Sequence, residues 1–381
     1  MKDSETKQYD ILLEWMWCAV NHQTPQRLPE DHAGYEQLLK ICIEQNITAF
    51  VAEAVEQSEA PEDIRSMFRD ERLNAVRVNI LMNEEGRKIQ ALLEQEKVPH
   101  VLLKGETIGC CYPDPFLRQK GDIDIWIEPD CAQNVKRIMT EQGYNTSHYG
   151  IYHDDVYRKA PFYCFEMHRM LFTERELLFH QYYEDRRRLW IPTEGTSYEY
   201  HLTDEEVYIY CVLHAVKHLQ KAGVGIRVLT DLYYYLERHK GLDFAYIQMQ
   251  LNRLKAEKEE QLLRQYSTKL FSPDGKEWLR GLPEKKRKWL YSLLQFGAYG
   301  NREHEIQQNI DKLSHGGKKK GAKLRYLTGR IFSIPEVYKI RCPRLYRHRL
   351  TRPLIFFVRL HNGLTVRRKS LIQEMKIILR K

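Results

Sequence analysis

The stretch LLKGETIGCCYPDPFLRQKGDIDIWI, Leu102 to Ile127, decides how this sequence is read. An apolar run ends in Lys104-Gly105, a Pro-containing loop follows, and Asp122 and Asp124 stand one residue apart inside a second run suited to burial. Burying two carboxylates is costly unless a positive group meets them. The question is therefore what these two carboxylates hold.

The carboxylates predict a metal site. Residues two apart on a strand face the same way, so Asp122 and Asp124 project together, and Glu166 and His168 repeat this spacing on a later predicted strand. If the two strands are neighbours, three carboxylates converge and repel one another unless divalent cations neutralise them. Oxygen ligands of this kind suit Mg²⁺ (or Mn²⁺), which takes further ligands from substrate phosphates. We therefore predict Asp122, Asp124 and Glu166 as metal ligands and catalytic residues.

Lys104-Gly105 predicts a phosphate contact. A glycine between a strand and a helix lets the backbone approach a ligand closely, and the start of a helix offers free N–H groups to an anion. Arg118 and Lys120 follow in the same loop and, with Lys104, supply positive charge for a triphosphate.

The order of these features resembles a known superfamily. Strand, Lys-Gly, helix, Arg-x-x-Gly-Asp-x-Asp and a later Glu-x-His are similar to the nucleotidyltransferases that include DNA polymerase beta. The resemblance is greatest to an uncharacterised bacterial nucleotidyltransferase family whose members read roughly "LKG … R … GDxDxxV … ExH". It covers residues 98–172 well and extends more loosely to HAVKHLQKAGVGIRVLTDL, His214 to Leu232.

This resemblance implies both a fold and an activity. The fold would be α+β, a small mixed β-sheet core flanked by N-terminal helices and a C-terminal helical region. The activity would be Mg²⁺-dependent transfer of a nucleoside monophosphate from an NTP to an acceptor hydroxyl, with release of pyrophosphate and catalysis by Asp122, Asp124 and Glu166. The residues assigned to nucleotide binding are Lys104, Gly105, Arg118, Lys120, Gly121, His168, Arg227 and Asp231.

Two departures keep an alternative open. Many superfamily members have Gly-Ser where this chain has Lys104-Gly105, and Asp where it has Glu166. The alternative is a catalytically inactive nucleotide- or polyanion-binding protein on the same fold. A third interpretation is a nucleic-acid enzyme such as a terminal transferase, whose activity would fall steeply with salt.

Several site residues also have structural interpretations. His168 could orient Glu166, contact phosphate or fill a structural position. Arg227 and Asp231, four residues apart, could form an ion pair on a helix surface instead of serving the site. His214 and His218 have the spacing of a zinc protease, but Ala215 replaces the Glu that such enzymes need as a base, which excludes that class.

Hydrophobic periodicity predicts four regions within the 381 residues: an N-terminal helical region at 1–97, an α/β core at 98–200, a helical domain at 201–313 and a basic helical tail at 314–381. The capping box at Thr203 to Glu206 opens the third region. The Gly- and Lys-rich segment from Ser314 to Lys323 predicts a linker. Eight cysteines without a C-x-x-C pair argue against a zinc or disulfide framework.

The charge is unevenly distributed. From Lys318 onward there are 19 Lys and Arg against two acids, whereas the rest of the chain has 41 against 50. Such asymmetry is typical of contact with a polyanion, although a basic tail folded onto the acidic body explains it equally. A later apolar stripe in this tail suits either docking on the body or an anionic surface, and we favour docking. The stripe comprises Leu371, Ile372, Met375, Ile378 and Leu379.

The sequence also indicates where the protein is located and which partners it has. No apolar run approaches the roughly 18 residues that a membrane span needs, and the N-terminus lacks the pattern of a signal peptide. We expect a cytoplasmic protein, with peripheral contact at a membrane surface as the second option. The expected partners are an NTP and an acceptor that the sequence leaves open among small molecules, sugars, proteins and RNA.

Overall fold

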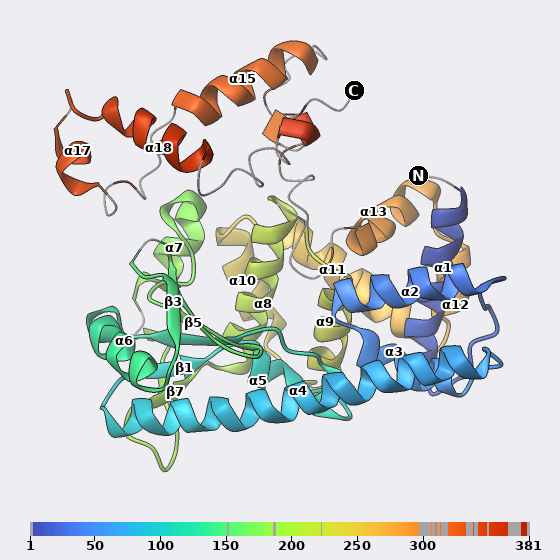
Figure 1. Ribbon diagram of the computed structural model, residues 1–381. Helices are drawn as coiled ribbons and strands as arrows, with labels where there is room; N and C mark the ends of the chain where they lie inside the picture. The colour runs from blue at the N-terminus through green and yellow to red at the C-terminus, as the bar shows by residue number, and fades with distance from the viewer. Residues whose placement is uncertain are drawn as a thin grey trace.

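The computed structural model describes residues 3–150, 152–185, 188–221, 223–295, 297, 306, 309–310, 313, 319–332, 338, 342–348, 350–364 and 375–378. It has the α+β fold that the sequence predicts (Figure 1). The N-terminal region is helical, as expected. Its helices are α1 (Asp3–Asn21), α2 (His32–Gln45), α3 (Thr48–Glu56) and the long α4 (Glu62–Gln95).

The core contains one mixed sheet of seven strands in the order β3-β4-β5-β2-β1-β7-β6. The strands are β1 (His100–Leu102), β2 (Ile123–Ile127), β3 (Asn145–His148), β4 (Asp154–Lys159), β5 (Tyr163–His168), β6 (Ile191–Pro192) and β7 (Glu199–His201). Short helices α5 (Gly105–Gly109), α6 (Ala132–Glu141) and α7 (Leu177–Glu184) connect them. Strand β2 lies between β1, its antiparallel neighbour, and β5, which runs parallel to it.

The alternation along β2 gives the sheet two different faces. Ile123, Ile125 and Ile127 pack with buried apolar residues of α4 and α6, and Figure 1 shows α4 lying along the sheet. Trp126 belongs to the other core, where its ring meets the ring of Tyr183 edge-on with centroids 5.9 Å apart. Apolar residues on both sides bury this central strand completely.

Three strands were not predicted. The strands predicted before Lys104-Gly105, at Asp124 and at Glu166 are present as β1, β2 and β5, whereas β3, β6 and β7 were missed. They have two to four residues each and little apolar alternation, so only pairing with a neighbouring strand defines them.

Helices follow the sheet, as expected. They are α8 (Asp204–Leu219), α9 (Arg227–Arg238), α10 (Phe244–Arg253), α11 (Glu257–Phe271), α12 (Gly275–Arg280) and α13 (Glu284–Gln295). The side chain of Thr203 caps α8 by accepting a hydrogen bond from the N–H of Glu206. Glu206 does not supply the reciprocal bond shown in a capping box, because its carboxylate accepts from the hydroxyls of Tyr182 and Tyr246.

The described part of the tail contains α15 (Lys319–Phe332), α17 (Pro343–Arg347) and α18 (Leu354–Leu364). The linker prediction is wrong for residues 319–323, which open α15 because Lys and Ala favour a helix; residues 314–318 lie outside the description. Of the predicted stripe, Ile378 is buried with Ile306, Ile310 and Ala322, whereas Met375 is exposed. Leu371, Ile372 and Leu379 lie outside the described residues. Across that description, no helix is long and apolar enough to cross a membrane.

Candidate functional site

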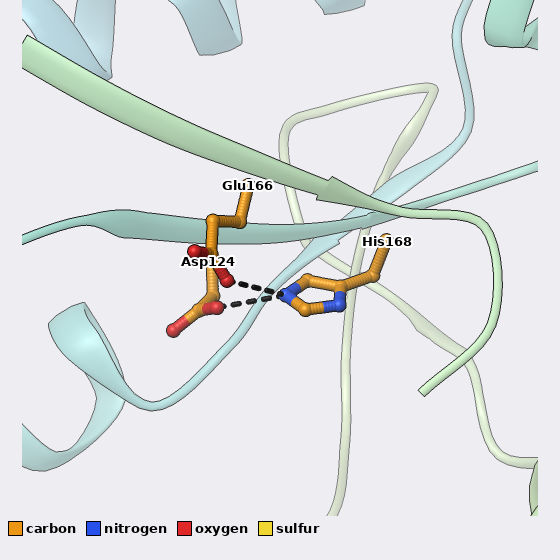
Figure 2. Close-up of side chains that lie close together, drawn as sticks. All are labelled: Asp124, Glu166 and His168. Atoms are coloured by element: carbon orange, nitrogen blue, oxygen red, sulfur yellow. Dashed lines mark hydrogen bonds and ion pairs between the residues drawn. The ribbon is translucent and has the colours of Figure 1, made fainter. Parts of the chain in front are cut away.

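Strand pairing brings the carboxylates of two strands together. Asp124 on β2 lies directly opposite Glu166 on β5, and Trp126 lies opposite His168. Nε2 of His168 is 2.7 Å from Oδ1 of Asp124 and 3.9 Å from Oε2 of Glu166 (Figure 2). One donor atom from each of the three lies within 4.8 Å of the others, which is the spacing of a metal site.

Asp122 takes a different position. It precedes β2 and lines a pocket of about 110 Å³ together with Asp124. It is not among the three residues whose donor atoms converge, so the structure forms the set Asp124, Glu166 and His168 where the sequence predicted Asp122, Asp124 and Glu166. Asp124 belongs to both sets. The site therefore has two overlapping groups of donors.

The carboxylates differ in their electrostatics. Burial, followed by the charges of Asp124 and Asp122, raises the pKa of Glu166 to about 7. Burial and the charge of Asp124 also raise the pKa of Asp122. Burial would raise the pKa of Asp124 as well, but the Lys104 ammonium and the hydrogen bond with His168 outweigh it and hold that pKa below its usual range. Such separated values on neighbouring acids are typical of functional sites.

Lys104 connects the carboxylates to helix α8. Its Nζ lies 3.5 Å from Oδ2 of Asp124 and donates to Nε2 of His214 over 2.9 Å. Nε2 of His218 lies 3.2 Å from the same atom of His214. Burial and the charge of Lys104 lower the pKa of His214 well below its ordinary value, and burial and nearby lysines lower that of His218 to about 3. Both imidazoles are therefore neutral near pH 7.

The backbone of Lys104 is also unusual. Its φ is +23°, in a region that residues other than glycine rarely adopt. Such conformations cost free energy and cluster at ligand sites. A Cβ added to the next residue, Gly105, would meet nothing within 4 Å, so the space in front of this glycine is open.

Most of the predicted nucleotide-binding residues share one pocket. The loops around β1 and β2 form one side of the pocket, and helices α8 and α9 form the other. Glu166 and His168 do not line it. The predicted residues that line it are Lys104, Gly105, Arg118, Lys120, Gly121, Arg227 and Asp231. His214 and His218 also line it, although the sequence placed them in the segment that resembles the family without giving them a role. Their spacing of four residues on one helix was the available signal.

Arg118 and Asp231 form a buried ion pair. Nε and Nη2 of Arg118 donate to the two carboxylate oxygens over 2.9 and 3.1 Å, and the hydroxyl of Tyr112 donates to Asp231 over 2.7 Å. The ion pair considered for Arg227 and Asp231 as an alternative to a site role is only a contact of 3.9 Å. Arg227 instead donates to the carbonyl of Gln119 over 2.6 Å. Asp231 therefore fixes the loop that precedes β2 through Arg118.

Helix α4 holds the same loop from the opposite side. The side-chain amide of Asn79, which is buried, donates to the carbonyls of Phe116 and Arg118 over 2.9 and 3.1 Å. Its oxygen accepts from the N–H of Lys120, whose ammonium bonds to Asn83. The loop is thus fixed by α4 and α9 before it enters β2.

Comparison with known proteins identifies one family. Residues 31–272, more than half of the chain, match the model of a family described as an uncharacterised nucleotidyltransferase. No curated protein and no solved structure matches significantly. The matched range includes α2 to α11 and every residue of the site.

Replacing Asp231 by Asn should destabilise the protein. The change leaves the guanidinium of Arg118, which is 5% exposed, without its principal counter-charge, and such losses cost about 3–5 kcal/mol. Urea unfolding followed by circular dichroism measures the change. Replacing Glu141 by Gln, which breaks an exposed pair with Arg137, should leave the midpoint unchanged. A loss below about 1 kcal/mol for the Asp231 variant would contradict the anchoring role.

Replacing Glu166 by Gln should flatten the pH dependence of stability. Because folding raises the pKa of Glu166 from 4.5 to about 7, the stability that it contributes is full below the first value and is lost as pH rises through the second. In EDTA, the wild-type free energy of unfolding should therefore fall across this window, and the variant should lose less. Replacing the exposed Glu174 by Gln should retain the wild-type slope. Equal slopes in all three proteins would disprove the raised pKa.

Proposed function

Because the chain belongs to the uncharacterised nucleotidyltransferase family, we propose that it transfers a nucleoside monophosphate from an NTP to an acceptor hydroxyl and releases pyrophosphate. The observation that carries the proposal is the position of Asp124 directly opposite Glu166 on neighbouring parallel strands. A buried acid beside a half-buried one suits a cationic cofactor and a phosphorylated substrate.

The donor groups fit a divalent cation. Carboxylate oxygens are the ligands that Mg²⁺ and Mn²⁺ prefer, and a cation would offset the burial and the repulsion that together raise the pKa of Glu166. Asp122 and Asp124 would hold one cation, and Asp124 and Glu166 a second. When bound, these ions would neutralise the charge that develops on the phosphoryl oxygens.

Glu166 is suited to accept the proton of the acceptor. The hydroxyl oxygen of the acceptor attacks the α-phosphorus as its proton passes to Glu166, and the bond between the α-phosphorus and the bridging oxygen breaks. Pyrophosphate leaves with the electron pair of that bond. The side chain of Glu166 is only partly buried, so the carboxylate can accept the proton and pass it to solvent afterwards.

The pocket beside the acids is suited to the triphosphate. Lys104, Lys120 and Arg227 line it with positive charge, and Arg118 lines it with its charge balanced by Asp231. The open space in front of Gly105 would let a phosphate approach the backbone. Gly121 lines the same pocket immediately before Asp122. Helix α5 has only five residues, so the backbone at Gly105 and not a helix dipole would make this contact.

A metal-free nucleotide or polyanion binder is the second candidate. The ammonium of Lys104 lies 3.5 Å from Asp124, and the imidazole of His168 hydrogen-bonds to its other oxygen, so this carboxylate already has positive and polar partners. Such a protein would tolerate removal of the acids. An enzyme would not.

Docking on the body is the favoured role of the basic tail, and contact with an anionic surface is its second role. Its excess of Lys and Arg supports this role in a cytoplasmic protein at a membrane surface. The acceptor is a small molecule, a sugar, a protein or RNA, and label transfer in the experiment below distinguishes them.

Replacing Asp124 by Asn should abolish transfer. The purified protein is incubated with each of the four α-labelled NTPs and Mg²⁺ or Mn²⁺, together with cell extract, and both pyrophosphate and labelled products are measured. Loss of the charge that both donor groups share should reduce transfer by at least about 100-fold. Replacing Asp130 by Asn, an exposed acid just beyond β2, should leave transfer unchanged. Undiminished transfer by the Asp124 variant would refute the proposal. If the wild type shows no turnover and the variant binds nucleotide as the wild type does, the metal-free binder is favoured.

Replacing Gly105 by Ala should impair nucleotide binding without affecting folding. The added Cβ meets no protein atom within 4 Å, so the unfolding midpoint should not fall. If a phosphate lies against this backbone, the methyl group should raise the nucleotide dissociation constant by about tenfold. Isothermal titration calorimetry measures the constant, and Gly109→Ala, where the space is also open, is the matched control. Equal affinity in wild type and Gly105 variant would rule out the contact.

A further inference from the structure

His168 is placed as a ligand would be. It lies at the end of β5, two residues after Glu166, and is 4% exposed. Figure 2 shows its imidazole ring directed at the carboxylates of both Asp124 and Glu166. The nitrogen that faces them, Nε2, is also the atom that completes the group of three converging donors.

We propose that Nε2 of His168 binds the divalent cation directly and that this nitrogen makes the site prefer Mn²⁺ to Mg²⁺. The inference rests on the proposed function, because it names the cation of the same site. It assigns His168 to the metal, whereas the sequence had suggested a contact with the nucleotide.

The distances suit a shared cation. Bonds of about 2.1 Å at right angles place neighbouring ligand atoms about 3 Å apart. Nε2 lies 2.7 Å from the oxygen of Asp124 and 3.9 Å from that of Glu166, so one separation must lengthen slightly and the other shorten. Both carboxylates come from paired strands, and only small side-chain rotations are needed.

The second ring nitrogen of His168, Nδ1, makes no hydrogen bond within the described structure. Nδ1 is buried, and the ring of His153 lies with its centroid 5.6 Å from that of His168. Without a cation, Nε2 must carry a hydrogen because it faces two carboxylates. With a cation between them, the proton moves to Nδ1 and the lone pair of Nε2 faces the metal.

Nitrogen ligation favours Mn²⁺. Mg²⁺ prefers oxygen ligands and gives up water reluctantly, whereas imidazole affinity rises through the transition metals. Two oxygen donors and one imidazole thus suit Mn²⁺ better than the all-oxygen pair Asp122 and Asp124.

Pulsed electron paramagnetic resonance of bound Mn²⁺ tests the proposal without an activity assay. The full-length protein is loaded with Mn²⁺, and the spin-echo modulation should show a directly coordinated ¹⁴N. Protein labelled with ¹⁵N-histidine should replace that coupling with the ¹⁵N coupling, which identifies an imidazole in the unmodified chain. The His168→Gln variant should lose the coupling and bind Mn²⁺ at least about tenfold more weakly.

Two comparisons separate ligation from a positioning role. The Gln side chain of His168→Gln still offers a hydrogen-bond donor to Asp124. If His168 only orients this carboxylate, the variant should therefore bind Mn²⁺ almost as tightly as the wild type. Affinity for Mg²⁺, measured by competition, should change by less than about threefold, so that the preference for Mn²⁺ is lost. His218→Gln is the control, because that imidazole contacts His214 and not the acids; its ¹⁴N coupling should persist.

Several outcomes would overturn the inference. They are wild-type Mn²⁺ without nitrogen coupling, a coupling that survives in His168→Gln, an equal loss of Mn²⁺ and Mg²⁺ affinity, or no Mn²⁺ binding at all. Circular dichroism in EDTA checks the fold of each variant, and the ¹⁵N-histidine spectrum of the wild type decides the ligand type if His168→Gln does not fold. A histidine coupling without NTP turnover would support His168 as a metal ligand and reject the proposed function. Turnover without the coupling would support the proposed function and reject His168 as a ligand.

Discussion

The structure depends on the parallel pairing of β2 with β5. This pairing places the carboxylates of Asp124 and Glu166 side by side in the centre of a sheet whose other face is covered by α4 and α6. Acids in such a position cannot both be ionised cheaply, and burial together with the charge of Asp124 raises the pKa of Glu166. The positive groups around them are therefore a requirement of the fold as well as of the proposed chemistry.

Three helices hold the loop residues around the acids in different ways. Helix α8 brings His214 to Lys104, which contacts Asp124. Helix α9 supplies Asp231 to bind Arg118, so one cation of the loop is neutralised and held in place. Helix α4 binds the backbone of the same loop through Asn79. The loop and the strand that it enters are therefore held on several sides, as a site that must position charged groups requires.

The arrangement also explains where stability is given up for function. Lys104 has a positive φ. Glu166 has a raised pKa and lies beside Asp124, whose pKa is lowered. Each feature costs free energy in the isolated protein, and each would be relieved or used when a cation and a nucleotide bind. The apolar packing of Ile123, Ile125 and Trp126 on both faces of the sheet supplies the stability that tolerates these costs.

The sequence by itself determined the local features. Alternation in DIDIWI placed the acids and isoleucines on opposite faces, and helical periodicity predicted the N-terminal and C-terminal helices, because such patterns depend only on neighbours along the chain. Tertiary structure alone decided which groups meet. Arg118 and not Arg227 is the main partner of Asp231, His168 turns toward Asp124, and β3, β6 and β7 exist only through pairing. These contacts join residues far apart in the chain, and no local period specifies which distant side chain will neutralise a buried charge.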